Sequence, residues 1–403
     1  MNTFKNPFRP GAGQPPPFLA GREDEKEEFS DLLNQSPISK NLILTGLRGV
    51  GKTVLLETLK PIALGRGWFW AGTDLSESAS VSEQSFSIRI LADLAPLVSS
   101  FTVSEEVIHP IGFNRPDQKI ETKLTFPVLV SIYENTPGLA ADKLKRVLET
   151  VWHTVKSKVN GIVLAYDEAQ NLKDKAADKE FPVSLLLEVV QYLQRKEIPY
   201  LLVLTGLPTL FPNLVETRTY AERMFHVITL DKLNGVESQE AIIKPIEAEE
   251  CPVTFTESAI AEIIGSSGGY PYFIQFFCKE LFDSYLQQLA VGIESTGVSI
   301  QGIVAKLDTD FYSGRWSRIT DRQRDLLITI AKLPTSNDEF TVQDIAFQSV
   351  ESLANPFKPS LINQMLNKLI EIGLVFKNRH GKYSFAVPML ADYINRQTEQ
   401  SSV

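Results

Sequence analysis

The stretch Asn41–Lys60, NLILTGLRGVGKTVLLETLK, decides the fold of this chain. An apolar run, Asn41–Thr45, leads into the pattern GxxxxGK[ST] at Gly46–Thr53, and a helix-like stretch, Val54–Leu64, follows. A phosphate-binding loop needs this context, because the free N–H groups at the helix start must point at the phosphates. The full pattern therefore predicts that the chain binds a nucleoside triphosphate.

Each type of residue in this loop has a separate expected role. The glycines permit backbone angles and close approaches that a Cβ atom would forbid. Lys52 is expected to reach the β- and γ-phosphates, and the Thr53 hydroxyl to bind Mg²⁺. The predicted nucleotide-binding residues of this segment are Gly46, Leu47, Arg48, Gly49, Val50, Gly51, Lys52, Thr53 and Val54.

Length and composition limit the class of protein. With 403 residues the chain is long enough for about two or three domains. The net charge of −9 argues against a surface covered with nucleic-acid contacts, although it leaves room for a local basic surface. No apolar run approaches the roughly 18–20 residues of a membrane span, and the proline-rich N-terminus lacks the apolar core of a signal peptide. We therefore expect a cytoplasmic protein without membrane association.

Cysteine and histidine usage points away from metal or disulfide chemistry. Cys251 and Cys278 are far apart in apolar surroundings, which favours buried thiols. The four histidines share no metal-ligand spacing, so no zinc site is expected.

An acidic pair supplies the second element that a hydrolytic site of this type requires. Asp167 and Glu168 follow the apolar run Gly161–Ala165, after Tyr166. At the end of a strand, Asp167 is expected to support the Mg²⁺ shell and Glu168 to activate the attacking water. Most Asp-Glu pairs are solvated surface, but the position of this one after a core strand favours the catalytic interpretation.

Two further polar residues fit the same site by position. Thr205 ends the next buried run, where its side chain could touch the γ-phosphate or the water, or cap the following turn. Arg223 could act on the phosphate of a neighbouring subunit, as arginine fingers do, or form a surface salt bridge.

The alternation of short apolar runs with longer helical stretches predicts an α/β fold with a parallel sheet covered on both faces. Within residues 76–135 we expect a helix at Ser85–Leu97 and an inserted hairpin within Ser99–Leu129. From about Ser238 the pattern becomes helical. The predicted domains are a P-loop core with an extended N-terminal arm (1–235), a helical lid (236–312) and a winged helix (313–398).

The predicted winged helix carries a candidate DNA-binding surface. A helix at Pro359–Ile372 is apolar on one side and amide-rich on the other, and a hairpin follows it. Residues 315–396 contain 11 basic and 8 acidic side chains, a net charge of +3 that leaves −12 for the rest of the chain. The predicted contacts to duplex DNA are Asn363, Gln364, Lys377, Arg379 and Lys382. A winged helix that binds protein partners is the alternative.

Taken together, these segments resemble the AAA+ and STAND-type P-loop ATPases. They are most similar to the branch that contains archaeal-type ATPases and the origin-recognition initiators. The matching segments span nearly the whole chain and are FLAGRE (18–23), TGLRGVGKT (45–53), AYDEAQ (165–170), LLVLTGLPTL (201–210), AERMF (221–225) and GGYPYFIQ (268–275). The resemblance implies that ATP or ADP binds with Mg²⁺. It also implies that Phe18 and Arg22 pack near the adenine, and that Tyr270 and Pro271 close a lid over the base and ribose.

The chain departs from this family at two positions. Tyr272 stands where many AAA+ proteins place a lid arginine, and Thr205 stands where initiators usually have asparagine. The missing arginine puts lid-coupled sensing of the γ-phosphate in doubt. A glycine–proline pattern without arginine is similar to that of STAND-type switches. The departures together suggest slow hydrolysis.

Three functions remain open on the sequence. The leading hypothesis is an ATPase whose nucleotide state controls the winged helix for DNA association, in replication initiation, transposition or phage defence. The competing hypothesis is a signalling or scaffold switch that acts on protein partners with little turnover. A chaperone-like remodeller is weaker, because no aromatic pore loop can be assigned. Homo-oligomer formation is possible, since Arg223 would act across an interface.

Overall fold

The computed structural model describes residues 5–11, 13–106, 119–248, 253–291, 299–379 and 381–400. The chain forms two compact units. The first, here called the loop-lid unit, comprises Met1–Gly21, Gly46–Val54 and Leu230–Val403. The second, the sheet unit, comprises Arg22–Thr45 and Leu55–Thr229.

A five-stranded sheet forms the centre of the sheet unit, in the order β2-β5-β6-β1-β7. Its strands are β1 (Asn41–Gly46), β2 (Trp68–Ala71), β5 (Gly161–Tyr166), β6 (Tyr200–Gly206) and β7 (Phe225–Leu230). The pairs β2–β5, β5–β6 and β6–β1 are parallel, and every residue of β1, β5 and β6 is buried. Continuous apolar runs are expected for strands covered on both faces, so the predicted parallel sheet is confirmed.

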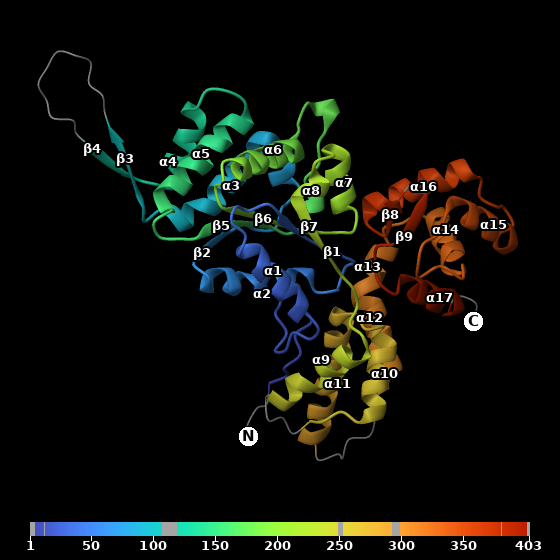
Figure 1. The fold of residues 1–403 in the computed structure, drawn as a ribbon. Coiled ribbons are helices and arrows are strands. Elements are labelled where there is room, and N and C mark those ends of the chain that lie inside the picture. Colours follow the sequence, from blue (N-terminus) through green and yellow to red (C-terminus); the bar gives the residue numbers. More distant parts are fainter. Residues whose placement is uncertain are drawn as a thin grey trace, which may run out of the picture. The chain divides into compact units, whose positions relative to one another are not determined.

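Helices cover both faces of this sheet (Figure 1). On one side lie α1 (Glu23–Leu33) and α2 (Lys52–Gly65), and on the other α3 (Glu83–Val98), α4 (Phe126–Asn135), α5 (Ala140–Val155) and α6 (Pro182–Arg195). The shorter helices α7 (Leu210–Thr217) and α8 (Ala221–Met224) lead into β7. The helices α3 to α6 share one apolar core with the strands.

The hairpin expected within Ser99–Leu129 is present but shorter than predicted. Strands β3 (Thr102–Glu106) and β4 (Lys119–Lys123) pair antiparallel, and Figure 1 shows them leading away from the helical layer. The end of the expected hairpin is wrong, because α4 begins at Phe126 with Pro127 in its first turn. Proline fits there, since the first N–H groups of a helix have no partner within the helix.

The loop-lid unit is mainly helical around one apolar core. Its helices are α9 (Gly235–Ala248), α10 (Glu257–Ser267), α11 (Pro271–Ala290), α12 (Ile300–Leu307), η4 (Asp308–Tyr312), α13 (Ser313–Trp316), α14 (Asp321–Ala331), α15 (Val342–Ser352), α16 (Pro359–Ile372) and α17 (Leu390–Gln400). In the N-terminal arm, the described residues 5–11 and 13–17 form no helix or strand. Phe8 of this arm is 2% exposed and packs against Phe255 and Phe282.

The C-terminal part of this unit has the element order expected of a winged helix. Three helices, α14 to α16, precede the antiparallel strands β8 (Val375–Arg379) and β9 (Lys382–Phe385). Capping boxes open α14 at Thr320 and α15 at Thr341, and Gly373 ends α16 with a φ of +76°. The domain boundaries after residues 235 and 312 stay predictions.

The environment of one of the two cysteines can be described. Cys278 is buried, which raises the pKa of its thiol well above the ordinary value, whereas Cys251 lies outside the described residues. In the part of the chain that the structure describes, no helix combines the length and apolar character of a membrane span.

Candidate nucleotide site

The phosphate loop lies between β1 and α2, as predicted. Gly49 and Gly51 adopt φ angles of +81° and +93°, a region that residues with a Cβ rarely enter. A Cβ added at Gly51 would meet no described atom within 4 Å, so this side of the loop is open. The ammonium group of Lys52 folds back over the loop and donates to the carbonyl oxygens of Gly46 at 3.0 Å and Leu47 at 2.8 Å.

The acidic pair directly follows β5. Asp167 is 3% exposed, and its Oδ1 accepts a hydrogen bond of 2.8 Å from the backbone N–H of Glu168. Backbone bonds of Asp167 to Thr73 and Leu75 fix this turn. Glu168 is exposed and has a φ of +52°, which is uncommon for a residue other than glycine and costs backbone strain. The turn therefore buries the aspartate and exposes the glutamate.

Gln170 is a residue of this site that the sequence analysis did not assign. Its Nε2 donates to the carboxylate of Glu168, and its Oε1 accepts a hydrogen bond of 3.1 Å from the N–H of Leu207. The amide thus joins the turn after β5 to the turn after β6. Gly206 leaves room for it, because a Cβ there would lie 2.6 Å from the same oxygen. The AYDEAQ segment contains Gln170, but sequence spacing gives no signal for a contact between two separate turns.

Two buried hydroxyl groups lie at the same edge of the sheet. Thr45 and Thr205 are the second-last residues of β1 and β6 and are 5% and 0% exposed. Neither hydroxyl has a hydrogen-bond partner among the described residues. A buried hydroxyl without a partner costs about 1–3 kcal/mol, so both are candidates for bonding to a ligand or to water. The hydroxyl of Thr205 does not cap the following turn in this structure.

Arg223 is exposed on α8 and makes no ion pair with any described residue. The surface salt bridge that was the alternative role of Arg223 is therefore not seen in the described part of the chain. The guanidinium is accessible on the surface of the sheet unit.

Three of the residues expected around the adenine lie in the loop-lid unit. Phe18 stacks under the ammonium of Lys244 at 5.2 Å, and Pro271 opens α11. Tyr270 is partly buried, which raises the pKa of its phenol. Arg22 belongs to the sheet unit, where it is 6% exposed and pairs with Glu25 at 3.1 Å. Helix α11 also contacts the loop directly, because the N–H of Tyr272 donates to the carbonyl of Gly49 at 3.1 Å.

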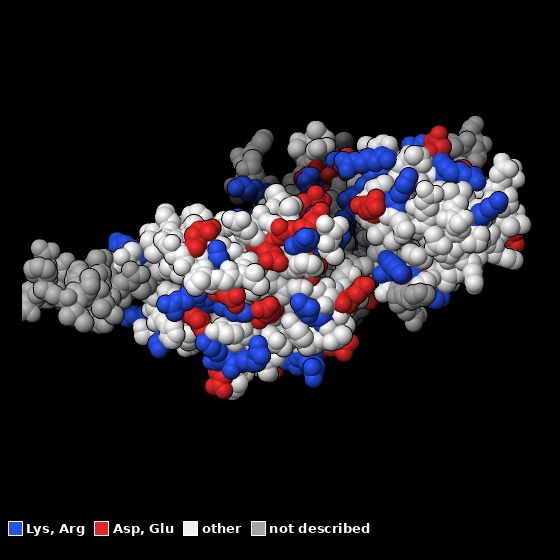
Figure 2. All heavy atoms as spheres, turned by 90° about the horizontal axis from the view of Figure 1, so that it is seen from above, with Lys and Arg blue, Asp and Glu red and all other residues white. Residues whose placement is uncertain are grey.

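The candidate DNA-contacting residues lie on the exposed side of α16 and on the hairpin. Asn363 and Gln364 are exposed, opposite the buried face of the helix, and the Asn363 amide donates to the Pro359 carbonyl at 3.0 Å. Lys377 is exposed and Lys382 is half-exposed. Arg379 lies in β8, but its side chain lies outside the described residues. Figure 2 shows Lys and Arg predominating over Asp and Glu on the visible face of the C-terminal helices.

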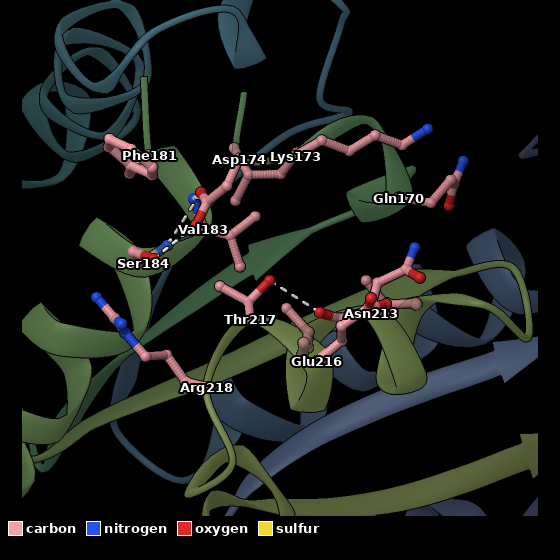
Figure 3. A pocket seen from close by; sticks show the side chains of 13 residues that line it. Gln170, Lys173, Asp174, Phe181, Val183, Ser184, Asn213, Glu216, Thr217 and Arg218 are labelled. Carbon is pink, nitrogen blue, oxygen red and sulfur yellow. Dashed lines mark hydrogen bonds between the residues drawn. The ribbon is translucent and has the colours of Figure 1, made fainter. Parts of the chain in front are cut away.

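A pocket of about 730 Å³ opens beside Gln170 in the sheet unit. Figure 3 shows Gln170, Lys173 and Asn213 along one side of it, and Phe181, Ser184 and Arg218 along the other. Asp174, which also lines it, accepts bonds from the N–H of Val183 at 2.8 Å and the Ser184 hydroxyl at 2.6 Å. This carboxylate therefore caps the start of α6.

Comparisons with known proteins define the class of this chain. Residues 19–204 match the AAA ATPase domain, and residues 309–394 match a domain of unknown function, DUF8462. No curated protein matches the sequence. A Walker-type ATPase of Pyrococcus abyssi is similar in structure, with a TM-score of 0.59 and 15% identity over 94% of this chain and 96% of that chain. The ORC2 protein of Aeropyrum pernix in its ADP form is also similar, with a TM-score of 0.57 and 13% identity over 97% of each chain.

The fold, the phosphate loop and the matched domain together define a P-loop protein with an AAA ATPase domain. The chain has a fold similar to that of the Walker-type ATPase and of the ORC2 protein.

Proposed function

We propose that this chain binds ATP or ADP at the phosphate loop, hydrolyses ATP slowly, and uses its nucleotide state to control DNA association by the C-terminal helices and hairpin. The observation that carries the proposal is the loop itself. Two glycines at positive φ keep its backbone open, and it joins a buried strand to the start of α2. The similar ORC2 structure in its ADP form supports a nucleotide at this position.

The residues present fit a nucleotide with Mg²⁺. Backbone groups of residues 46–54 would hold the phosphates, and Lys52 would exchange its two carbonyl acceptors for phosphate oxygens. The Thr53 hydroxyl and the Asp167 carboxylate are oxygen donors of the kind that Mg²⁺ prefers. When bound, Mg²⁺ neutralises charge that develops on the phosphate oxygens.

The remaining residues take the roles expected from their positions. Glu168 would accept a proton from the attacking water, with Gln170 holding its carboxylate. The buried hydroxyl of Thr205 would bond to the γ-phosphate or the water. Arg223 is exposed, as a residue acting on the phosphate of a second copy must be. Phe18, Arg22, Tyr270 and Pro271 would surround the base and ribose.

Titration calorimetry with ATP and magnesium tests the binding step. Wild-type protein should take up one nucleotide per chain, and Lys52→Ala should lose most of the binding. Lys60→Ala is the matched control, because Lys60 is exposed further along the same helix and should bind ATP as the wild type does. If folded wild-type protein takes up neither ATP nor ADP, the proposed function is wrong.

The DNA step rests on the C-terminal surface. The exposed amides on α16 can donate to and accept from base edges, and the lysines of the hairpin can contact phosphates. The net charge of +3 over residues 315–396, in a chain of net charge −9, favours an approach of DNA to this part.

Anisotropy measurements with duplex DNA at two salt concentrations test this step. Each lost phosphate contact should reduce the slope of log affinity against log salt by about 0.9, so Lys377→Ala with Lys382→Ala should reduce it by roughly 2. Lys156→Ala with Lys158→Ala, two exposed lysines of the sheet unit, is the control and should leave the slope unchanged. Equal slopes in all three proteins would remove the hairpin from the DNA interface.

A second candidate function, a switch acting on a protein partner, is favoured by one observation. Phe347 and Val350 are 71% and 67% exposed and lie three positions apart on α15, so they present a small apolar face to solvent. This function predicts ATP binding with negligible turnover, with or without DNA. Measuring molecular size with and without nucleotide then decides whether Arg223 can act across an interface between copies.

A further inference from the structure

The N-terminal arm is fastened to α11 by hydrogen bonds at two places. The Nδ2 of Asn6 donates to the carbonyl of Lys279 at 2.9 Å and to Oδ1 of Asp283 at 2.7 Å. Three residues later, the N–H of Arg9 donates to Oε1 of Gln275 at 3.2 Å. Gln275 is 8% exposed, so the arm supplies a partner for a buried amide of the helix. Two turns of the arm's backbone therefore depend on α11 for their position.

An aromatic side chain between these two places anchors the arm in the core of the loop-lid unit. The ring of Phe8 lies 6.1 Å from the ring of Phe255 and 6.2 Å from that of Phe282. The N–H of Phe8 donates to Oδ1 of Asn6 at 2.9 Å. The amide of Asn6 thus holds the arm to α11 and also fixes the backbone at the aromatic anchor.

Beyond this anchor the arm turns toward the phosphate loop. The N–H of Gly11 donates to the carbonyl of Arg9 at 2.8 Å, and the N–H of Gln14 donates to the carbonyl of Gly11 at 3.3 Å. Gly13 has a φ of +67°, and a Cβ added there would lie 3.3 Å from Cγ2 of Thr53. Since this distance is shorter than an ordinary Cβ contact, the glycine allows the arm to lie directly against the side chain of Thr53.

The helix that holds the arm is also bonded to the phosphate loop. The N–H of Tyr272, in the first turn of α11, donates to the carbonyl of Gly49 at 3.1 Å. The arm, α11 and the loop therefore contact one another in turn and belong to one compact unit. Thr53 is the residue whose hydroxyl is proposed to bind Mg²⁺, so a nucleotide whose magnesium reaches Thr53 comes close to the arm.

The part of the arm next to Thr53 can move without unfolding the unit. The described residues 5–11 and 13–17 form no helix or strand, and Gly11 and Gly13 give the turn wide backbone freedom. Segments with few buried contacts open locally at a small cost in free energy. Phe8 can stay in its core while the bonds of Asn6 and Arg9 to α11 break and form again.

We propose that the N-terminal arm is a gate at the phosphate loop, which lifts from Thr53 before a nucleotide with magnesium enters or leaves. The inference rests on the proposed nucleotide binding and adds a control on its rate. A gate must open for entry and for exit alike. Weakening the bonds that hold the arm on α11 therefore raises both rate constants and leaves their ratio, the dissociation constant, nearly unchanged.

Stopped-flow measurements with a fluorescent ADP analogue and Mg²⁺ test the gate on the full chain. Asn6→Ala removes the bonds to α11 and should raise the association and dissociation rate constants together by roughly fivefold, the change (~1 kcal/mol) that one net hydrogen bond produces. Gln275→Ala weakens the same contact from the helix and should act in the same direction. Asn135→Ala is the matched control, because this amide bonds to the Ser131 hydroxyl at 3.1 Å in the sheet unit and should leave both rates unchanged.

The possible outcomes separate the gate from the function on which it rests. If wild type takes up no nucleotide, the proposed function itself fails. If wild type binds, and Asn6→Ala and Gln275→Ala leave both rate constants unchanged, the arm only completes the core and the gate is wrong. A faster dissociation at unchanged association would make the arm a direct contact of the bound nucleotide, which also overturns the gate. If Asn6→Ala fails to fold, Asn6→Asp decides by the same criteria, because it keeps the shape and places a carboxylate against that of Asp283.

Discussion

Replacement of Glu168 by glutamine isolates the chemical step from the binding step. Glu168 is exposed, and in the described part of the chain its carboxylate accepts a hydrogen bond from the amide of Gln170 and forms no ion pair. Glutamine has the same shape and tolerates the backbone φ of +52° as well as glutamate does. A surface change of this kind alters the free energy of unfolding by about 0.5 kcal/mol or less. The fold and the phosphate loop should therefore stay intact.

The size of the kinetic effect follows from the role proposed for the carboxylate. A positioned general base contributes roughly 10²–10⁴-fold to a rate. At 1.36 kcal/mol for each factor of ten, the barrier should rise by about 3–5.5 kcal/mol. The affinity for ATP should not fall, because the phosphates are held by the loop. Glu168→Gln should therefore accumulate bound ATP while phosphate release almost stops.

Steady-state phosphate release measures the rate, and calorimetry measures ATP binding on the same preparations. Glu57→Gln is the control, since Glu57 is an exposed carboxylate on α2 that has no proposed role at the site. Normal turnover by Glu168→Gln would show that another group activates the water. A parallel loss of binding and turnover would show that the residue acts in the structure of the site.

Three other substitutions test the environment of the site and of the lid. Thr205→Val should leave the melting temperature equal or higher, because it removes a buried hydroxyl without a described partner. The same change should slow phosphate release, and unaltered release would exclude Thr205 from the site. Phe8→Ala should lower the free energy of unfolding by about 3–5 kcal/mol in chemical denaturation, whereas Phe347→Ala, on the surface, should change it little. Arg396→Ala should cost about 3 kcal/mol in the same assay, because it leaves the carboxylate of Asp308, 7% exposed, without its two-bond partner. Adding Asp308→Asn should recover much of that loss, and no recovery would contradict the ion-pair argument.

The elements that could be predicted from the sequence have strong local signals. The apolar runs of β1, β5 and β6 are short and unbroken, which is typical of strands buried on both faces, and the structure buries every residue in them. The glycine pattern predicted the phosphate loop, because only glycine adopts the backbone angles of this loop without strain. The capping boxes of α14 and α15 likewise depend on residues three positions apart.

The elements that were missed depend on partners distant in sequence. Strand β7 lies at the edge of the sheet and is only partly buried, so its residues lack the continuous apolar run of the central strands. The contact of Gln170 with Leu207 and the placement of Phe8 in the core of the loop-lid unit are decided by folding and not by spacing. The start of α4 was hidden because a β-branched stretch continues across Pro127.

The same long-range packing gives the proposed nucleotide control a physical path within the loop-lid unit. The carbonyl of Gly49 in the loop accepts the N–H of Tyr272, whose ring packs 5.7 Å from that of Phe273. Phe273 lies 6.2 Å from Tyr312, and Tyr312 stacks on Tyr393 of α17 at 4.8 Å. Close-packed rings move together, since the interior has little free volume to absorb a shift. These four rings therefore connect the phosphate loop with α17, and they are the packed contacts that the proposed nucleotide control would use.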